Sequence, residues 1–344
     1  MRYQISYLAF IATNLAYAAP TGKRDSSSDQ ALLNLEREGQ GILPNGPPPP
    51  TISPDGATNL KLIAFNELFE VAFFTELVAN LTAKIPGYDL ADEHDYVLDA
   101  VKVIAAQEEM HAVNANGALT HFNQGAIQPC KYSFPVSNFT DAIRLAATFT
   151  DMVLGTLQDV SEIFARSGDF DLVHAVASVI GNEGEQEGFF RVEQGKRPSA
   201  QPFLTGAARD FAFTAIQSFV IEGSCPSIGS IPLKTFKPLT VETKDIHPKT
   251  QNLTFSFSMK DAGMFELDQL RLVFLNGQNV PLVKKPQNVE MLNERVAFQA
   301  EFPFEEFVMQ GLTIAAVTMG ADHFAGADDV AKQTIFGPGI IEMY

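Results

Sequence analysis

The stretch "QEEMHAVNANG", residues 107–117, carries a carboxylate and an imidazole three positions apart, Glu108 and His111. Residues with this spacing lie on the same face of a helix. A Glu-x-x-His pair on the inner face of a helix bundle is half of a ligand set for two metal ions. The same pair also occurs on ordinary polar faces, so its meaning depends on the helices around it.

The surrounding sequence has the periodicity of a helix bundle. Apolar residues recur at alternating steps of three and four in four segments that begin near residues 59, 97, 139 and 172, and a fifth helix is predicted at about 207–222. In each of the four apolar stripes, polar residues interrupt the series at mid-helix: Glu67 and Glu70, Glu108 and His111, Thr150, and Glu183 and Gln186. Because their neighbours on each stripe are apolar, we expect these side chains to face inward at one level of a four-helix bundle.

Such a polar layer is costly unless its groups are paired, protonated or bound to metal. Carboxylate and imidazole ligands suit iron or manganese. A two-metal bundle site takes one Glu from each of two helices and Glu-x-x-His from each of the other two. Here the first helix offers Glu67 or Glu70, and its nearly all-round apolar character does not select between them. Gln186 stands where the second His belongs, and the third helix offers only Thr150.

Four segments resemble a known family: "NELFEVAFFTEL", "QEEMHAVNANGAL", "ATFTDMVLGTLQDV" and "NEGEQEGFFR". They are similar to the ferritin-like domain family of many fungal secreted proteins, and most of all to its late sexual development and stress-response branch. The resemblance spans residues 59–223 and implies metal-ligand positions at Glu70, Glu108, His111 and Glu183. Thr150 and Gln186 depart from it, standing where a Glu and a His are expected.

Two interpretations of the layer stay open. In the first, it holds metal, as a single iron or manganese ion, with Glu67 able to replace a lost ligand. In the second, it is a metal-free remnant held by hydrogen bonds, in which His111 bonds a carboxylate, Gln186 donates its amide to another and Thr150 caps a third. At least one carboxyl group would then be protonated, because burial raises its pKa.

The N-terminus has the features of an export signal. Arg2 precedes an apolar run that is too short for a membrane span, and Ala16-Tyr17-Ala18 fits a small-x-small cleavage site. We therefore expect a signal peptide at residues 1–18 and a propeptide at 19–24 that ends in the dibasic pair Lys23-Arg24; a plain N-terminal helix is the alternative. No later segment reaches the length of a transmembrane helix.

Other residues agree with export. Three sequons predict N-glycosylation, at Asn80, Asn138 and Asn252. The only two cysteines, Cys130 and Cys225, are expected to form a disulfide in a secreted chain, and two buried thiols are the alternative. The predicted location is extracellular, in solution or at the cell wall.

The predicted fold class is α+β with two domains. Residues 25–58 are polar and Pro-rich and are expected to be a disordered segment. Residues 59–228 are the predicted ferritin-like bundle with its fifth helix. Residues 229–344 alternate apolar and polar residues in several short runs, with an Asn-Gly turn between two of them, which predicts a small β-sandwich.

The formal charge of −17 argues against nucleic acid and anionic membrane surfaces as partners. No nucleophile elbow or phosphate-binding loop occurs. The leading hypothesis is a secreted glycoprotein of fungal development or stress response with a degenerate metal site and no robust catalysis. The alternatives are an iron- or manganese-dependent oxidase or peroxide scavenger, and a protein that binds the cell wall or a partner through its β half, which an exposed aromatic patch there would favour. The sequence does not predict the oligomeric state.

Overall fold

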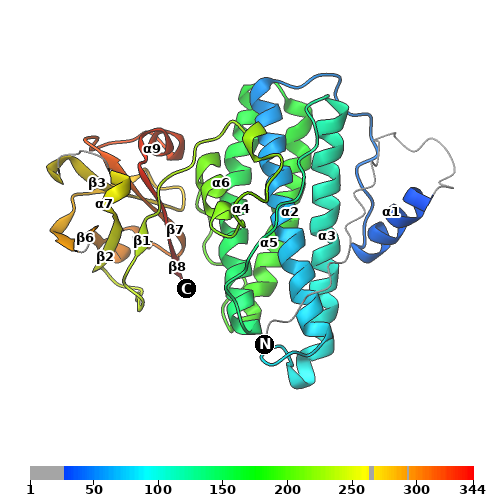
Figure 1. Cartoon of the computed structure of the whole chain (residues 1–344), viewed down its shortest axis with the longest axis horizontal. Helices are drawn as coiled ribbons and strands as arrows, with labels where there is room; N and C mark the ends of the chain where they lie inside the picture. Colours follow the sequence, from blue (N-terminus) through cyan, green and yellow to red (C-terminus); the bar gives the residue numbers. More distant parts are fainter. Residues whose placement is uncertain (1–26, 263–266, 293) are drawn as a thin grey trace.

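The computed structural model describes residues 27–262, 267–292 and 294–344 (Figure 1). The predicted signal peptide and propeptide lie outside these residues. Four long helices stand side by side as a bundle: α2 (Pro54–Thr82), α3 (His94–His121), α4 (Phe139–Arg166) and α5 (Phe170–Glu193). A short helix, α6 (Arg209–Gln217), covers the fifth predicted helical segment in part. None of the described helices has the length and apolar content that crossing a bilayer requires.

Helix α2 begins at Pro54, five residues before the predicted start. Ser53 caps it, since its hydroxyl oxygen accepts a hydrogen bond from the Gly56 N–H at 2.9 Å, and proline is favoured in the first helical turn. The Ser53 hydroxyl also donates to Asp169, which directly precedes α5, at 2.5 Å. One residue therefore starts α2 and ties it to the beginning of α5.

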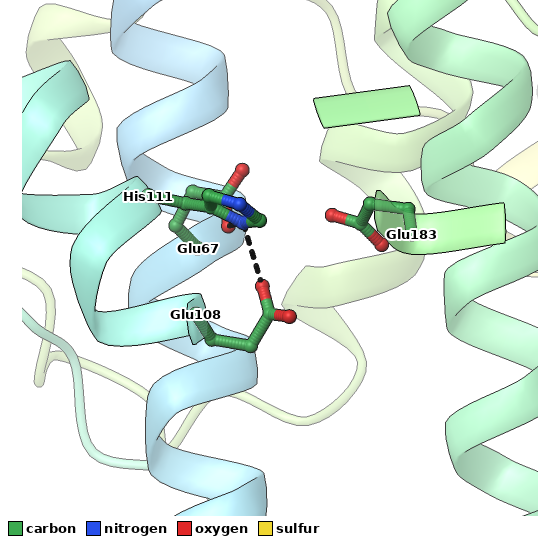
Figure 2. Close-up of side chains that lie close together, drawn as sticks. All are labelled: Glu67, Glu108, His111 and Glu183. Atoms are coloured by element: carbon green, nitrogen blue, oxygen red, sulfur yellow. Dashed lines mark hydrogen bonds and ion pairs between the residues drawn. The ribbon is translucent and has the colours of Figure 1, made fainter. Parts of the chain in front are cut away.

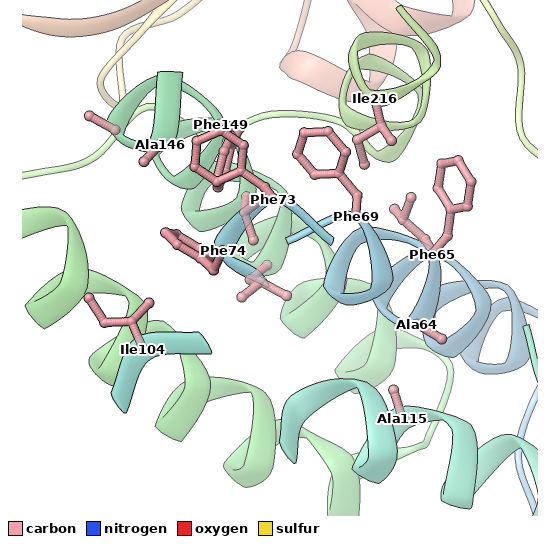
Figure 3. Close-up of a cluster of buried hydrophobic side chains, with 14 of the residues drawn as sticks. Ala64, Phe65, Phe69, Phe73, Phe74, Ile104, Ala115, Ala146, Phe149 and Ile216 are labelled. Atoms are coloured by element: carbon pink, nitrogen blue, oxygen red, sulfur yellow. The ribbon is translucent and has the colours of Figure 1, made fainter. Parts of the chain in front are cut away.

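The core of the bundle is rich in phenylalanine (Figure 3). Phe69 and Phe73 of α2 pack edge-on against Phe149 of α4, with ring centroids 5.2 and 5.0 Å apart. Phe74 stacks on Phe190 of α5 at 5.6 Å. Phe65 faces Phe213 of α6. Helix α2 is apolar on nearly all sides because it packs against α3, α4 and α6 at once.

The expectation of a disordered segment at residues 25–58 is wrong for the part that the structure describes. Residues 27–38 form a helix, α1 (Ser27–Glu38), which packs against α3. Its half-buried leucines, at 32, 33 and 35, provide the apolar face for this contact. The Gln107 amide of α3 donates to the carbonyl of Gly39 at 3.4 Å. The segment is thus ordered by contacts with α3 that composition alone does not reveal.

The C-terminal half is a sandwich of two four-stranded antiparallel sheets, ordered β1-β2-β6-β5 and β4-β3-β7-β8. The strands are β1 (Thr240–Val241), β2 (Gln251–Ser258), β3 (Leu270–Asn276), β4 (Leu282–Lys284), β5 (Gln287–Leu292), β6 (Arg295–Phe302), β7 (Gly311–Met319) and β8 (Phe336–Met343). The described residues of this half also form three short α-helices: α7 (Met259–Ala262), α8 (Phe304–Phe307) and α9 (Ala327–Gln333). The predicted sandwich is confirmed, including the β3–β4 pair around its Asn-Gly turn.

The β4-β3-β7-β8 sheet is buried on both faces. One face packs on the other sheet through residues such as Leu272 and Phe274. The opposite face, with Val273 and Ile314, packs on α4 and α6 around Phe211. Figure 1 shows α6 on the side of the bundle that faces the β half. At this contact, a Cβ on Gly155 of α4 would collide with the backbone oxygen of residue 205, so only glycine allows so close an approach.

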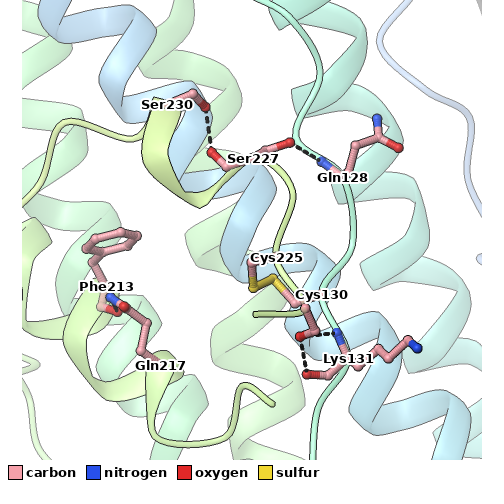
Figure 4. The surroundings of a disulfide bond; sticks show 9 residues. Gln128, Cys130, Lys131, Phe213, Gln217, Cys225, Ser227 and Ser230 are labelled. Atoms are coloured by element: carbon pink, nitrogen blue, oxygen red, sulfur yellow. Dashed lines mark hydrogen bonds between the residues drawn. A yellow bond between two sulfur atoms is a disulfide. The ribbon is translucent and has the colours of Figure 1, made fainter. Parts of the chain in front are cut away.

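The predicted disulfide between Cys130 and Cys225 is confirmed (Figure 4). It joins the chain after α3 to the chain after α6, across 95 positions of sequence. Backbone hydrogen bonds beside it, such as Ile221 N–H to the Lys131 carbonyl at 2.8 Å, align the same two segments. On the loop-entropy account, closing so long a loop stabilises the fold by about 4 kcal/mol.

Candidate metal centre

Four buried or mostly buried side chains meet inside the bundle (Figure 2). Glu67 comes from α2, Glu108 and His111 from α3, and Glu183 from α5. Each offers one ligand atom, and these four atoms lie within 4.8 Å of one another. Glu108 and Glu183 are fully buried, Glu67 is 1% exposed, and the His111 side chain is 16% exposed. The polar layer predicted from the apolar stripes is therefore present at one level of the bundle.

The spacing suits one ion. Oxygen and nitrogen ligands bind small divalent cations at about 2.1 Å, which puts opposite ligands about 4.2 Å apart. Ligand atoms within 4.8 Å of one another reach that geometry when they move by a few tenths of an ångström.

His111 is paired with carboxylates. Its Nδ1 lies 3.2 Å from Glu108 Oε2 and 3.5 Å from Glu67 Oε2. Burial lowers the pKa of the imidazole, but the charges of Glu108 and Glu67 outweigh it and hold that pKa well above its usual value. Burial raises the pKa of Glu67 to about 7 against the opposing charge of His111. Without metal, the imidazole is therefore a charged partner for these acids.

Gln186 holds Glu108 from the other side. Its amide donates to Glu108 Oε1 at 2.5 Å. Burial raises the pKa of Glu108, but His111 and this amide together bring it below its usual value. Two features of the hydrogen-bonded arrangement set out from the sequence are thus present: His111 bonds a carboxylate and Gln186 donates to one.

Glu183, unlike Glu108, is not held by hydrogen bonds from its described neighbours. Among the described residues, neither of its carboxylate oxygens has a hydrogen-bond partner. Burial and the nearby charge of Glu108 raise its pKa well above the usual value. A fully buried carboxylate without partners costs several kcal/mol as an ion. It therefore fits either a protonated acid or a ligand that faces a cation.

Glu70, the first-helix carboxylate implied by the family resemblance, is outside the four-residue cluster. It is buried, and its Oε2 accepts a hydrogen bond from the Asn66 amide at 3.0 Å. Burial, with Glu183 next in effect, raises its pKa well above the usual value. Of the two candidates on α2, Glu67 is the one that joins Glu108, His111 and Glu183.

Thr150 does not cap a carboxylate. It is fully buried on α4, and its hydroxyl has no hydrogen-bond partner within the described part of the chain. The third helix thus contributes no charged ligand at its predicted position.

One comparison with known proteins finds a match, to a domain family. Residues 58–196 match the family model of the Ferritin-like domain. This segment is a ferritin-like domain. The match contains α2 to α5 and all four residues of the cluster, and it ends before α6 and the β half. No curated protein matches the chain.

A cavity of about 230 Å³ leads to the cluster of the ferritin-like domain. Its walls come from α2, α3, α4 and α5, and the Pro-rich residues 44–49 form one side. Glu67 and His111 both line it. Two of the four candidate ligands are therefore accessible from this space, whereas no cavity was anticipated from the sequence.

A second buried polar cluster lies between the ferritin-like domain and β8, and sequence reasoning missed it. Asp151 of α4 and Glu187 of α5 are 5% and 4% exposed, and Arg191 Nη1 lies 4.0 Å from Glu187. Burial raises the pKa of Asp151 to about 6 and that of Glu187 to about 10. Glu342 of β8 is near both, and burial raises its pKa well above the usual value.

The cations of this second cluster lie over an aromatic ring. Lys196 Nζ is 3.0 Å, and the Arg191 guanidinium 4.8 Å, from the centre of the Tyr344 ring. Burial lowers the pKa of Lys196 to about 8. Asp151 and Glu187 lie off the helical stripes, and Glu342 is more than 150 positions further along the chain, so the apolar periodicity did not indicate this cluster.

The three sequons stay predictions. Asn252 is exposed on β2, and Asn80 is half-buried on α2. Asn138 is the N-cap of α4, and its side-chain amide donates to Asp141 at 2.8 Å. A glycan on Asn138 would have to share the nitrogen that makes this contact.

Proposed function

We propose that this protein is a secreted ferritin-like protein that binds one iron or manganese ion through Glu67, Glu108, His111 and Glu183, without robust catalysis. The observation that carries the proposal is Glu183, a fully buried carboxylate whose oxygens have no hydrogen-bond partner among the described residues and whose ligand atom lies within 4.8 Å of three others. A cation at this point would compensate the buried charge.

One ion, rather than two, follows from the ligands present. Thr150 provides a neutral hydroxyl where a second ion would need a carboxylate. The Gln186 amide is engaged with Glu108, and an amide is a weak ligand for transition metals. A bound iron or manganese ion would supply Lewis acidity and a redox-active centre.

The chain's own residues set the conditions for binding. His111 must lose the proton that Glu108 and Glu67 favour, and Glu183 must lose the proton that burial favours. Metal binding therefore competes with protons. Gln186 holds Glu108 in position, since its amide contacts one oxygen and leaves the other toward His111.

Elemental analysis of protein purified without chelator tests the proposal. We expect close to one iron or manganese per chain in the wild type, and none in the double variant Glu108→Ala/His111→Ala. Glu185→Ala is the matched control, because Glu185 is exposed on the same helix as Glu183. Two ions per chain would contradict the single-ion site, and absence of metal in the wild type would leave the remnant interpretation.

A metal-dependent oxidase or peroxide-scavenging activity is the second candidate. It is supported by the cavity that reaches Glu67 and His111, because a catalytic metal needs access for a substrate. Hydrogen peroxide consumption by metal-loaded protein, compared with the same Glu108→Ala/His111→Ala variant, tests this activity. Equal rates in both proteins would exclude it.

The proposed export and biological role rest on other grounds. The signal-like N-terminus supports secretion, and a disulfide and glycosylation at the three sequons fit it. The role in fungal development or stress response rests on the motif resemblance alone. Binding to a cell wall or partner through the β half has less support, because the exposed large apolar side chains described there, at Met259, Val280, Met291 and Val308, include no aromatic residue.

A further inference from the structure

The cavity beside the metal centre is lined mainly by apolar side chains. Ile63 of α2, Ala118 of α3, Phe164 of α4 and Ala175 of α5 are among the residues that face it. Its volume of about 230 Å³ exceeds the 150 Å³ of an engineered apolar cavity that takes up benzene. A ligand with an aliphatic body larger than benzene therefore fits this space.

Residues 44–49, here called the strap, cover one side of the cavity. In Figure 1 the chain runs from α1 past α3 to the start of α2. The strap is tied at both ends: Leu43 N–H donates to Glu36 at 3.3 Å, and the His121 ring nitrogen lies 2.9 Å from the Pro49 carbonyl oxygen. The strap is thus attached to α1 and α3 on either side of the cavity.

The composition of the strap suits an apolar ligand. Pro44, Pro47, Pro48 and Pro49 all line the cavity. Proline has no backbone N–H, so a wall of prolines presents few unsatisfied donors to an apolar molecule. Proline-rich chain is also stiff, so less conformational entropy is lost when it covers a ligand.

The inner end of the cavity is polar. Glu67 and His111 line it there, and His111 is paired with Glu67 and Glu108. A head group that forms hydrogen bonds would find both a carboxylate and an imidazole. A neutral head group can use both partners without bringing a further charge into this buried site, and burial of a further charge is costly.

We propose that this cavity binds a small neutral molecule with an aliphatic body and one hydrogen-bonding head group, the head lying at Glu67 and His111 and the body between the strap, α3 and α5. The head group would contact Glu67 and His111, which are also two of the proposed metal ligands, so the cavity is tested in chelator-treated protein.

Calorimetric titration of the chelator-treated full-length protein with straight-chain 1-alkanols from butanol to decanol tests the proposal. We expect saturable binding, with an affinity that rises about fourfold for each added CH₂ group and stops rising when the cavity is full. Octanoate is expected to bind at least tenfold more weakly than octanol. Absence of saturable binding, or an octanoate affinity equal to that of octanol, would overturn the proposal.

Cavity-filling variants locate the ligand. Ala175→Leu on α5 and Ala118→Leu on α3 each add bulk to the lining, and we expect each to weaken octanol binding at least tenfold. Ala177→Leu is the matched control, since Ala177 is exposed on the same helix and does not line the cavity. Circular dichroism establishes that each variant is folded, and either folded cavity variant is sufficient. Unchanged octanol affinity in a folded cavity variant would place the ligand elsewhere and refute the site.

Discussion

Glu183 and Gln186 lie one helical turn apart on α5, and they decide what the site is able to bind. Glu183 is a buried acid without hydrogen-bond partners among the described residues, whereas Gln186 donates to Glu108. A His at position 186 would complete a second Glu-x-x-His pair opposite the first. The difference between a single-ion site and a fuller ligand set is thus concentrated in one side chain.

Gln186→His is expected to raise the affinity for Fe²⁺ or Mn²⁺ at least tenfold, because imidazole replaces a weak amide ligand. Competition titration against a coloured chelator measures this change. The exposed neighbour provides the control, as Glu185→His places the same side chain outside the bundle. A gain of equal size in Glu185→His would contradict a role for position 186.

Glu183→Gln should act in opposite directions with and without metal. The pKa of Glu183 is raised, so the folded apoprotein retains a proton that the unfolded chain releases above its ordinary pKa, and stability falls as pH rises. Gln removes this cost, so we expect the apoprotein to gain about 1–3 kcal/mol at pH 8 and little at pH 4. The rise in melting temperature on adding Mn²⁺ should disappear. Loss of apoprotein stability at pH 8 would show that Glu183 has partners in solution.

At the scale of helices and strands, elements with a regular apolar periodicity could be predicted from the sequence, and elements without one could not. The stripes of α3, α4 and α5 located Glu108, Thr150 and Glu183 correctly in the core, with His111 partly buried beside them. Helix α2 packs on three neighbours and is apolar on nearly all sides. Its sequence therefore did not show whether Glu67 or Glu70 joins the cluster, and only the three-dimensional structure did. Strand β8 was not among the alternating runs that predicted the sandwich, because Gly337, Pro338 and Gly339 interrupt its apolar alternation.

The start of α2 offers a test at this scale. Ser53→Ala removes the side-chain cap on Gly56 and the hydroxyl contact with Asp169 but keeps the backbone N–H bond to Asp169, so we expect the free energy of unfolding to fall by about 1–2 kcal/mol. Urea denaturation measures the change. Thr51→Ala, at an exposed position two residues earlier, should leave stability within about 0.5 kcal/mol. Equal effects of the two substitutions would argue against the cap.

At the scale of the whole molecule, the ferritin-like domain and the β half meet through both apolar and titratable groups. Asp151, Glu187 and Arg191 of the helices face Glu342 and Tyr344 of the β half, with Lys196 beside them. This contact joins residues that are far apart in sequence, so neither half's pattern predicted it. The two-domain division was visible in the sequence, but the way the domains join was not.

This interface should make stability depend on pH. Glu187 has a raised pKa of about 10, so the folded state binds a proton that the unfolded state loses above about pH 4.5, and stability falls as pH rises through this interval. Glu187→Gln is expected to add about 1–3 kcal/mol at pH 8 and almost nothing at pH 4. Thermal unfolding between pH 4 and pH 8 measures this gain in stability, and Glu185→Gln is the control. A pH-independent effect would exclude proton linkage at Glu187.

Burial of the β4-β3-β7-β8 sheet on both faces has a consequence for how the sequence can evolve. Each residue such as Val273 or Ile314 that faces α4 and α6 is under selection from the other domain as well as from its own. The two domains are therefore expected to tolerate exchange between related proteins poorly. A β half taken from a relative would carry a sheet face that is complementary to the helices of that relative and not to α4 and α6 of this chain. Residues on the two sides of this contact should covary among related sequences, and Gly155 should be among the least variable positions.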